Sequence, residues 1–161
     1  MRRLKIYLDT SVISHLDAPD TPDKMNDTMK LWGKMKNGLY EIVTSDIALG
    51  EISNCKEPKQ SILLDYLAEI EYEQFSITDE AEFLANEIIK QGILTQKNFD
   101  DCLHIAIAVI VNCDIILSWN FKHMVNIKTI NGVRAVNLLN GYKSIDIFTP
   151  TILIKGDDTD E

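Results

Sequence analysis

Short apolar runs alternate along the chain with longer segments in which apolar residues recur at helical spacing. The runs at residues 4–8, 41–44, 72–77, 114–117 and 145–148 predict strands. The segments between them predict helices at residues 12–16, 22–37, 47–55, 58–67, 79–92, 99–111, 120–125 and 129–141. Continuous apolar strands that alternate with helices are typical of an α/β fold. The pattern predicts a three-layer α/β/α sandwich with a central, mostly parallel five-stranded sheet.

Two helix starts carry cap signals. Ser45 or Asp46 is expected to cap the helix at residues 47–55, which carries Glu51 one turn in. Asn98 is expected to cap the helix at residues 99–111, which is apolar almost all round and is therefore predicted to be central.

The length of 161 residues suits one domain, which we place at residues 1–154. Asp157, Asp158, Asp160 and Glu161 crowd the end of the chain. We expect residues 155–161 to form an acidic, disordered tail.

Charge and composition restrict the class of protein. The formal net charge of −9 argues against a protein that coats nucleic acid through bulk electrostatics. The apolar run at the N-terminus is too short for a signal peptide, and no stretch approaches a membrane span. Cysteines are odd in number and form no CxxC pair, so we expect Cys102 and Cys113 to be small core residues. A soluble, cytoplasmic protein with no membrane partner is expected.

Polar residues follow two of the predicted strands. Asp9 comes directly after the first strand, and Asn120 follows the fourth. Ligands of open parallel sheets bind outside the carboxyl ends of the strands. Asp9 and Asn120 are therefore expected to open into the same crevice.

Three acids form the candidate chemistry of this crevice. Taken singly, Asp9 is a helix cap and Glu51 a solvated helix residue. Asp100 and Asp101 lie side by side at the start of the most apolar helix. One carboxylate there is favoured by the helix N-terminus, but the second is repelled by the charge of the first. A divalent cation would offset that repulsion and would also serve phosphoester hydrolysis.

Four segments resemble the motifs of PIN-domain proteins. They are IYLDTSVI at residues 6–13, DCLHIAIA at residues 101–108, LSWNFKH at residues 117–123 and the closing GYKSIDIFTP at residues 141–150. The family usually has Asp-Ala-x-His-Ile-Ala-x-Ala at the second of these segments. Glu51 stands where the family has its second acid.

The resemblance implies a Mg²⁺- or Mn²⁺-dependent ribonuclease with Asp9, Glu51 and Asp101 as metal ligands or as residues that orient bound water. Many bacterial members are VapC-like toxins that a small antitoxin neutralises, and a homodimer is expected by the same resemblance. Thr10, Ser11 and Ser118 are then candidates to hydrogen-bond a ligand or a phosphate of the RNA substrate.

The chain departs from the family at Asn120, where many relatives have Asp. Asn120 keeps an oxygen that can face a cation and remains a candidate catalytic residue, but it lacks the charge. This predicts a weaker second metal site and lower activity. Asp100 and His104 are candidate supporting residues, because His104 shares a helix face with Asp101.

Several alternatives stay open. A phosphotransferase of the haloacid dehalogenase type would need Asp where the chain has Ser11. A non-catalytic PIN-like binding module accommodates Asn120 and the negative charge, and the sequence does not separate DNA from RNA as substrate. A zinc site is disfavoured because no ligand spacing links the histidines. Trp119 is expected in the core, and Lys122 and His123 are expected at a cleft rim or a solvated turn.

Overall fold

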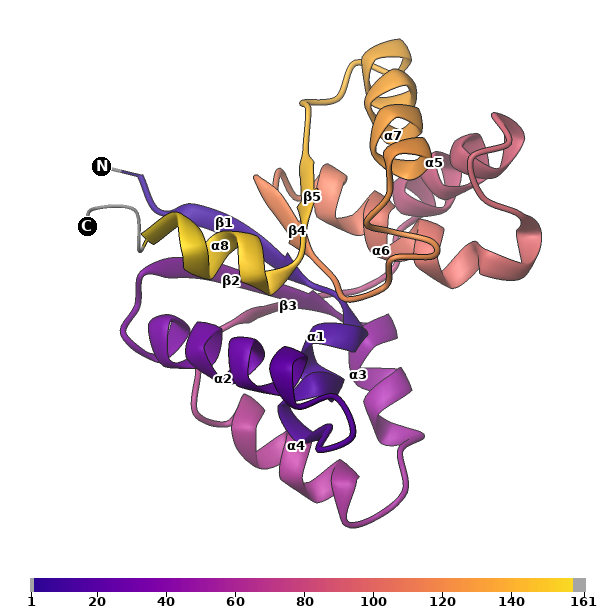
Figure 1. Cartoon of the computed structure of the whole chain (residues 1–161). Helices are drawn as coiled ribbons and strands as arrows, with labels where there is room; N and C mark the ends of the chain where they lie inside the picture. The colour runs from indigo at the N-terminus through magenta and orange to yellow at the C-terminus, as the bar shows by residue number, and fades with distance from the viewer. Residues whose placement is uncertain (1, 158–161) are drawn as a thin grey trace.

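A sheet of five parallel strands forms the centre of the molecule in the computed structural model, which describes residues 2–157 (Figure 1). The strand order is β3-β2-β1-β4-β5. The strands are β1 (Leu4–Leu8), β2 (Tyr40–Ser45), β3 (Glu73–Phe75), β4 (Ile115–Leu117) and β5 (Asp146–Phe148). Every pairing is parallel, which confirms the predicted sheet.

Helices cover both faces of the sheet. On one side lie α1 (Thr10–Ser14), α2 (Pro22–Lys36), α4 (Lys59–Leu67) and α8 (Pro150–Asp157), and on the other lie α5 (Asp79–Lys90), α6 (Phe99–Ile110) and α7 (Ile127–Leu139) (Figure 1). The remaining elements are η1 (His15–Asp17), α3 (Asp46–Ser53) and η2 (Gln96–Asn98). The predicted three-layer α/β/α sandwich is confirmed.

The alternation of side chains along β1 divides the interior into two cores. Tyr7 packs with residues of α5, α6 and α7, whereas Ile6 and Leu8 pack with residues of α1, α2 and α4. Successive strand residues point to opposite faces, so a central strand must be apolar on both. Residues 102–109 of α6 are all buried, as expected for a central helix, and they include Cys102.

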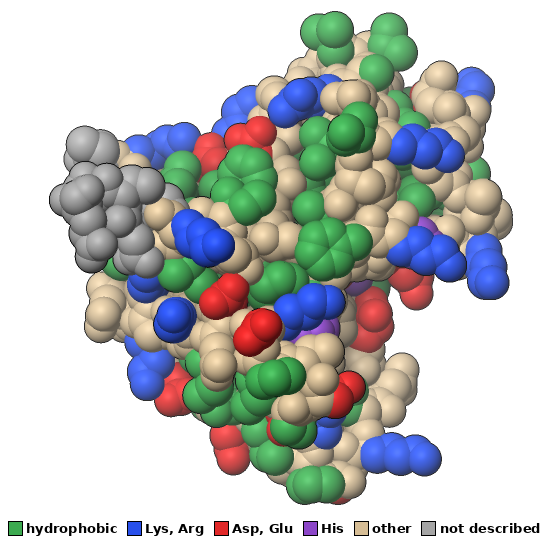
Figure 2. Space-filling view, in the orientation of Figure 1, with side chains coloured by type: hydrophobic (Ala, Val, Ile, Leu, Met, Phe, Trp, Pro, Cys, Tyr) green, Lys and Arg blue, Asp and Glu red, His purple; other side chains and the backbone are tan. Residues whose placement is uncertain are grey.

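Apolar side chains also reach the surface. Figure 2 shows hydrophobic side chains gathered at the end of α7 that points away from the sheet, where Leu138 and Leu139 are exposed. In the described part of the chain, no helix is long and apolar enough to cross a membrane.

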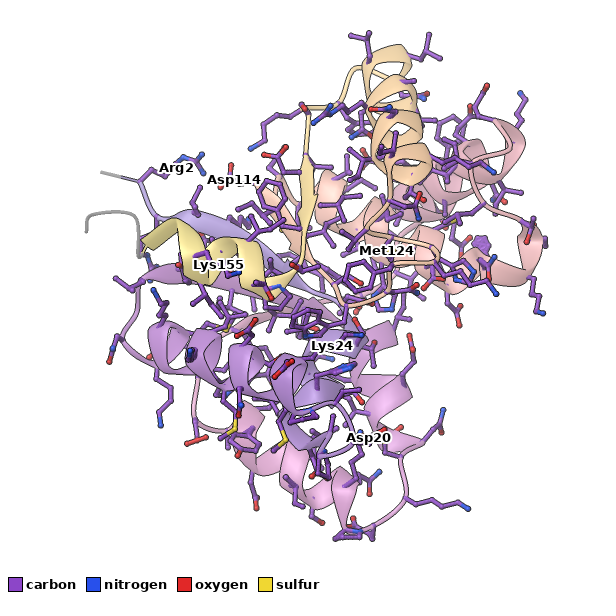
Figure 3. All side chains as sticks on the ribbon, in the orientation of Figure 1. Arg2, Asp20, Lys24, Asp114, Met124 and Lys155 are labelled. Carbon is purple, nitrogen blue, oxygen red and sulfur yellow. The ribbon has the colours of Figure 1, made fainter. Side chains whose placement is uncertain are left out.

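The start of the chain is tied to the start of β4 by an ion-pair cluster around Asp114 (Figure 3). Arg2 donates two hydrogen bonds of 2.9 Å to the Asp114 carboxylate, and Lys143 Nζ lies 3.0 Å from it. The Lys5 N–H also donates to it at 2.8 Å. The Arg2 hydrogen bond contributes most to holding the pKa of Asp114 well below its ordinary value. The cluster joins the amino end of β1 to the amino end of β4.

The order of strands brings the carboxyl ends of β1 and β4 side by side at the point where the connection reverses. The chain moves outward from β1 through β2 and β3, then returns to the other side of β1 as β4. Leu8 pairs with Leu117, so both strands end at the same level. Such a reversal is the usual ligand-binding position of open parallel sheets.

The short helix predicted at residues 120–125 is wrong, because this segment is a turn that leads into α7. The Met124 and Val125 N–H groups both donate to the carbonyl of Asn120. Asn126 then donates to the carbonyls of residues 121 and 122 and caps α7. A continuing helix would need those two carbonyls for its own hydrogen bonds.

Two further expectations differ from the structure. Asn98 stands at the N-cap of α6, but its side chain makes no capping bond. No helix is predicted after residue 141, whereas Pro150 is the first residue of α8, which packs on α2. The predicted tail at residues 155–161 therefore overlaps the end of α8, and residues 158–161 lie outside the described residues.

Gly132 of α7 is a close-packing position. A Cβ atom there would lie 2.5 Å from Cγ1 of Ile93 and 3.0 Å from its Cγ2, whereas Gly33 of α2 has open space. We expect Gly132→Ala to lower the free energy of unfolding by about 1–3 kcal/mol through overpacking. Gly33→Ala, the matched control, should be neutral or stabilising because alanine favours helix. Denaturant unfolding measures both, and equal stability of the two variants would contradict this packing.

Candidate active site

Asp9 lies at the carboxyl end of β1 and is 4% exposed. Its backbone N–H donates to the Leu117 carbonyl of β4. Its Oδ2 accepts hydrogen bonds of 2.7 Å from the hydroxyls of Ser11 and Ser118. Asp9 occupies the N-cap position of α1, yet its side chain makes no capping bond. The interpretation of Asp9 as a helix cap is therefore wrong for its carboxylate.

The same two hydroxyls hold the loop that follows β4. Ser118 Oγ accepts from the Asn120 N–H at 3.0 Å, and Ser11 Oγ accepts from the Trp119 N–H at 2.9 Å. The Asp9 carboxylate is thus connected to the chain beyond β4 through two uncharged hydroxyl donors, which orient it without cancelling its charge.

His104 lies between two of the predicted acids. It is 1% exposed on α6, and its Nε2 is 2.9 Å from Oε1 of Glu51 and 3.6 Å from Oδ1 of Asp9. Thr10 Oγ1 is 3.5 Å from the same nitrogen. The structure therefore brings Thr10, predicted as a supporting residue, to His104.

The partners of the other ring nitrogen of His104 were not predicted from the sequence. His104 Nδ1 lies 2.6 Å from the Tyr7 hydroxyl, which lies 2.7 Å from Ser45 Oγ. Ser45 also caps α3, which carries Glu51. The one available signal was a phenol inside the buried strand β1, because a buried hydroxyl needs a polar partner.

Charge determines the proton state of this network. Burial lowers the pKa of His104, but the hydrogen bond to Glu51 and the charges of Asp9, Glu51 and Asp101 raise it by more, so the net direction is upward. Burial raises the pKa of Tyr7 well above its ordinary value, and the phenol stays protonated. Both ring nitrogens of His104 thus have an oxygen partner, Glu51 on one side and Tyr7 on the other, as a protonated imidazole requires.

Asp101 projects from the first turn of α6 and is partly buried. Its Oδ2 lies 3.0 Å from Nδ1 of His123, a residue that the sequence placed only at the rim. Burial raises the pKa of Asp101 and the charge of Asp9 raises it further, while His104 and His123 oppose both. Asp100 is exposed and makes no recorded contact with these groups among residues 2–157.

Asn120 lies one hydrogen-bonded residue away from Asp9, but its side chain serves its own turn. Its Oδ1 accepts from the His123 N–H at 2.9 Å. Its backbone N–H reaches Asp9 only through the Ser118 hydroxyl. The amide at this position therefore shapes the loop that carries His123.

The donor set suits a hard divalent cation. Asp9, Glu51 and Asp101 offer carboxylate oxygens from three elements, the ligand type that Mg²⁺ prefers. Within residues 2–157, no three His, Cys, Asp or Glu side chains are arranged to hold a metal ion together. Mg²⁺ commonly takes one or two carboxylates and completes its shell with water and substrate phosphates, so two of these acids are sufficient.

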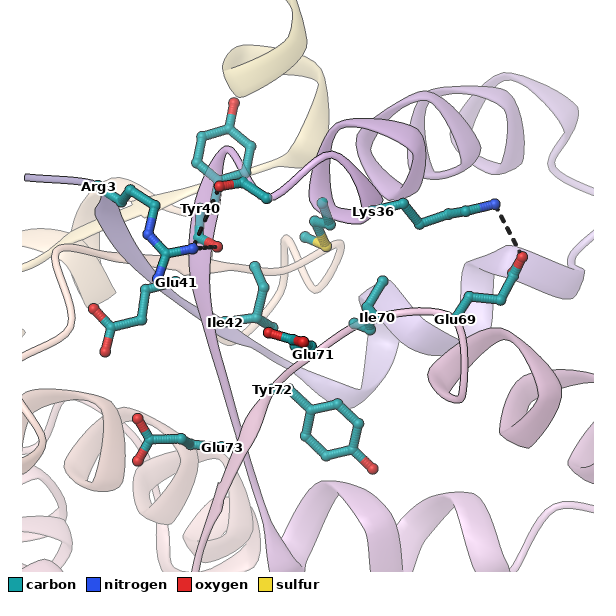
Figure 4. Close-up of a pocket in the computed structure, with 12 residues that line it drawn as sticks. Arg3, Lys36, Tyr40, Glu41, Ile42, Glu69, Ile70, Glu71, Tyr72 and Glu73 are labelled. Atoms are coloured by element: carbon teal, nitrogen blue, oxygen red, sulfur yellow. Dashed lines mark hydrogen bonds and ion pairs between the residues drawn. The ribbon is translucent and has the colours of Figure 1, made fainter.

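A pocket of about 460 Å³ lies at the other end of the sheet (Figure 4). It is lined by residues at the amino ends of β1, β2 and β3, including Arg3, Tyr40, Glu41 and Glu73. None of the acids of the candidate site lines it. The pocket is therefore separate from the crevice that holds Asp9.

The sequence profile of the PIN domain matches residues 6–122. The chain belongs to the PIN domain family. The match spans Asp9, Glu51, Asp101 and Asn120, and it confirms the resemblance that the motifs carry. No curated protein matches the sequence.

Two solved structures share the fold of this PIN domain. The VapC20 toxin of Mycobacterium tuberculosis, described as cleaving the Sarcin-Ricin loop, has a TM-score of 0.58 at 18% identity and covers 73% of this chain and 92% of its own. VapBC2 of Rickettsia felis, bound to a DNA fragment of its promoter, has a TM-score of 0.56 at 17% identity and covers 91% of this chain and 98% of its own. At such identities the likeness concerns the fold.

The raised pKa of Asp101 predicts a pH-dependent stability of the PIN domain. A carboxyl whose pKa is higher in the folded state destabilises the fold progressively as pH rises from the unfolded pKa to the folded pKa, and the full destabilisation is present above both. We expect Asp101→Asn to raise the melting temperature by a few degrees at pH 7 in EDTA, with the gain shrinking as pH falls toward about 4, the ordinary Asp pKa. Thermal unfolding across pH measures this, with the exposed Asp100→Asn as control. A lower melting temperature of Asp101→Asn at pH 7 would show that its bond to His123 dominates.

Proposed function

We propose that this PIN domain is a metal-dependent endoribonuclease that cleaves phosphodiester bonds of RNA. The observation that carries the proposal is the convergence of Asp9 and Asp101. They come from β1 and α6, and the charge of one raises the pKa of the other. A buried carboxylate at the carboxyl end of a central strand and a partly buried one that repels it from a neighbouring helix are typical of a functional site.

Two or more of Asp9, Glu51 and Asp101 would hold Mg²⁺ or Mn²⁺, with water and substrate phosphates completing the shell. Such an ion supplies Lewis-acid polarisation of the phosphoryl group and a nucleophile at neutral pH. Ser11 and Ser118 orient the Asp9 carboxylate by their hydrogen bonds at Oδ2, and Oδ1 stays directed toward His104.

The two histidines position the other acids. His104 holds Glu51, and His123 holds Asp101. Mutation of a residue that orients a metal ligand typically reduces metal affinity or activity by about 10- to 100-fold. We therefore assign positioning roles to His104 and His123.

We further propose that the protein acts as the toxin of a toxin–antitoxin pair, with a small antitoxin as its partner. The VapC20 and VapBC2 folds support this assignment. The homodimer remains a prediction, and the exposed leucines of α7 offer apolar surface for either association.

Removal of one acid should abolish cleavage without unfolding the protein. We expect Asp9→Asn to reduce RNA cleavage by about 100-fold or more, since even the loss of a residue that orients a metal ligand reduces activity 10- to 100-fold. The amide still accepts from Ser11 and Ser118, so the melting temperature should not fall. Gel-based cleavage of single-stranded RNA in Mg²⁺ or Mn²⁺, with and without EDTA, measures this.

Asp100→Asn is the matched control because it removes the same charge one residue before Asp101 at an exposed position. It should cleave at the wild-type rate. Cleavage that survives EDTA, or that Asp100→Asn and Asp9→Asn lose equally, would contradict the assignment of this site.

Asn120→Asp should strengthen metal binding. An aspartate can keep one oxygen on the His123 N–H while its charge increases the attraction for a cation. We expect a larger rise of melting temperature with Mn²⁺ and faster cleavage than in the wild type. Asn86→Asp adds the same charge on the exposed side of α5 and should change neither property. Unchanged Mn²⁺ affinity in Asn120→Asp would sink this role.

The competing function is a PIN-like module that binds RNA or protein without cleavage. One observation favours it, namely that the amide of Asn120 caps the turn at residues 121–124 where many relatives have an acid. A folded, partner-free protein that binds RNA but does not cleave it in Mn²⁺ would establish this function.

A further inference from the structure

The loop after β4 exposes an aromatic ring beside the acidic centre. Phe121 is 50% exposed, whereas Trp119, two residues before it, is 7% exposed. A single exposed Phe side chain is unremarkable on most protein surfaces. Here the ring follows Asn120 directly and precedes His123, which contacts Asp101. Phe121 therefore lies at the rim of the proposed catalytic crevice.

Hydrogen bonds on both sides make the Phe121 position rigid. Trp119 Nε1 donates to the buried Thr28 hydroxyl of α2 at 2.9 Å. Asn126 Nδ2 donates to the carbonyls of Phe121 and Lys122, at 3.0 Å each. A ring presented on a fixed turn loses little entropy when a ligand stacks on it.

A cation accompanies the ring. Lys24 of α2 has its Nζ 5.3 Å from the centre of the Phe121 ring and 5.8 Å from the centre of the Trp119 ring. Figure 3 shows Lys24 at the end of α2 nearest the loop that carries Met124. On the face drawn in Figure 2, hydrophobic, basic and histidine side chains lie together near the centre of the view, with acidic side chains beside them. Lysine contacts to phosphate and aromatic contacts to bases are the two recurring elements of single-strand binding.

We propose that Phe121 is the platform on which an unpaired base of the RNA substrate stacks, with Lys24 binding the adjoining phosphate. The inference rests on the proposed ribonuclease function and names its substrate as single-stranded at this position. A base inside a duplex has no free face for the ring, so the platform selects loops and unpaired segments. Lys24 also supplies local positive charge on a protein whose net charge of −9 repels RNA.

Binding and cleavage test the platform separately. Anisotropy of a labelled oligoadenylate is measured in Mg²⁺ with Asp9→Asn as the parent, so that cleavage does not consume the probe. Phe121→Ala in this parent should weaken binding about 5- to 100-fold, as expected for the loss of one stacked base. Phe121→Trp should restore it. Phe83→Ala, which removes a similarly exposed ring from α5, should have no effect.

An oligonucleotide with abasic sites in place of its bases provides the second arm. Phe121→Ala and its parent should bind this probe equally, because no base remains to stack. Lys24→Ala should weaken binding of both oligonucleotides, because the lysine contacts phosphate and not a base.

Equal affinity of Phe121→Ala and its parent for oligoadenylate overturns the proposal, as does failure of Phe121→Trp to rescue. No measurable binding by the parent overturns it too. Failure of the proposed ribonuclease function gives a different result. In that case the wild type does not cleave RNA in Mn²⁺, but Phe121→Ala still binds oligoadenylate more weakly than its parent. A Phe121→Ala enzyme that cleaves with unchanged KM disproves the platform alone.

Discussion

Repulsion between carboxylates is the constraint around which this molecule is arranged. Asp9, Glu51 and Asp101 come from a strand and two helices, and their charges would separate those elements without compensation. In the protein alone the compensating group is His104, whose Nε2 lies between Glu51 and Asp9. Its other nitrogen is anchored through Tyr7 and Ser45 to the ends of β1 and β2. The histidine thus links α6 to the sheet at the point where the acids meet.

The fold could be predicted from periodicity because its strands are buried on both faces. Ile6, Tyr7 and Leu8 are consecutive buried residues at the end of β1, and such runs identify a central parallel strand. Periodicity predicted the wrong structure where a side chain takes the hydrogen bonds that backbone N–H groups make in a helix. Asn126 takes the carbonyls at residues 121 and 122, and nothing in the apolar pattern of this segment reveals that contact.

The positions of the acids in the candidate site could be predicted from the sequence, but their hydrogen-bond partners could not. Asp9 and Asn120 follow from strand ends, and Asp101 from its position in an otherwise apolar helix. The partners of these acids were not predictable from spacing, because Ser118 reaches Asp9 and His123 reaches Asp101 only after the chain has folded. Asp100 and Asp101 look equivalent in the sequence, and the helix rotation between them makes one exposed and the other part of the site.

The pairing of β1 with β4 has a consequence for the nascent protein. Ser118 is synthesised more than a hundred residues after Asp9, and β4 cannot join the sheet until then. Long-range pairing of this kind is slow relative to local structure. Until β4 is made, a growing chain therefore lacks the hydroxyl of Ser118 and the loop after β4. If the finished protein cleaves RNA, its late-folding strand keeps that activity away from the ribosome and message that are producing it.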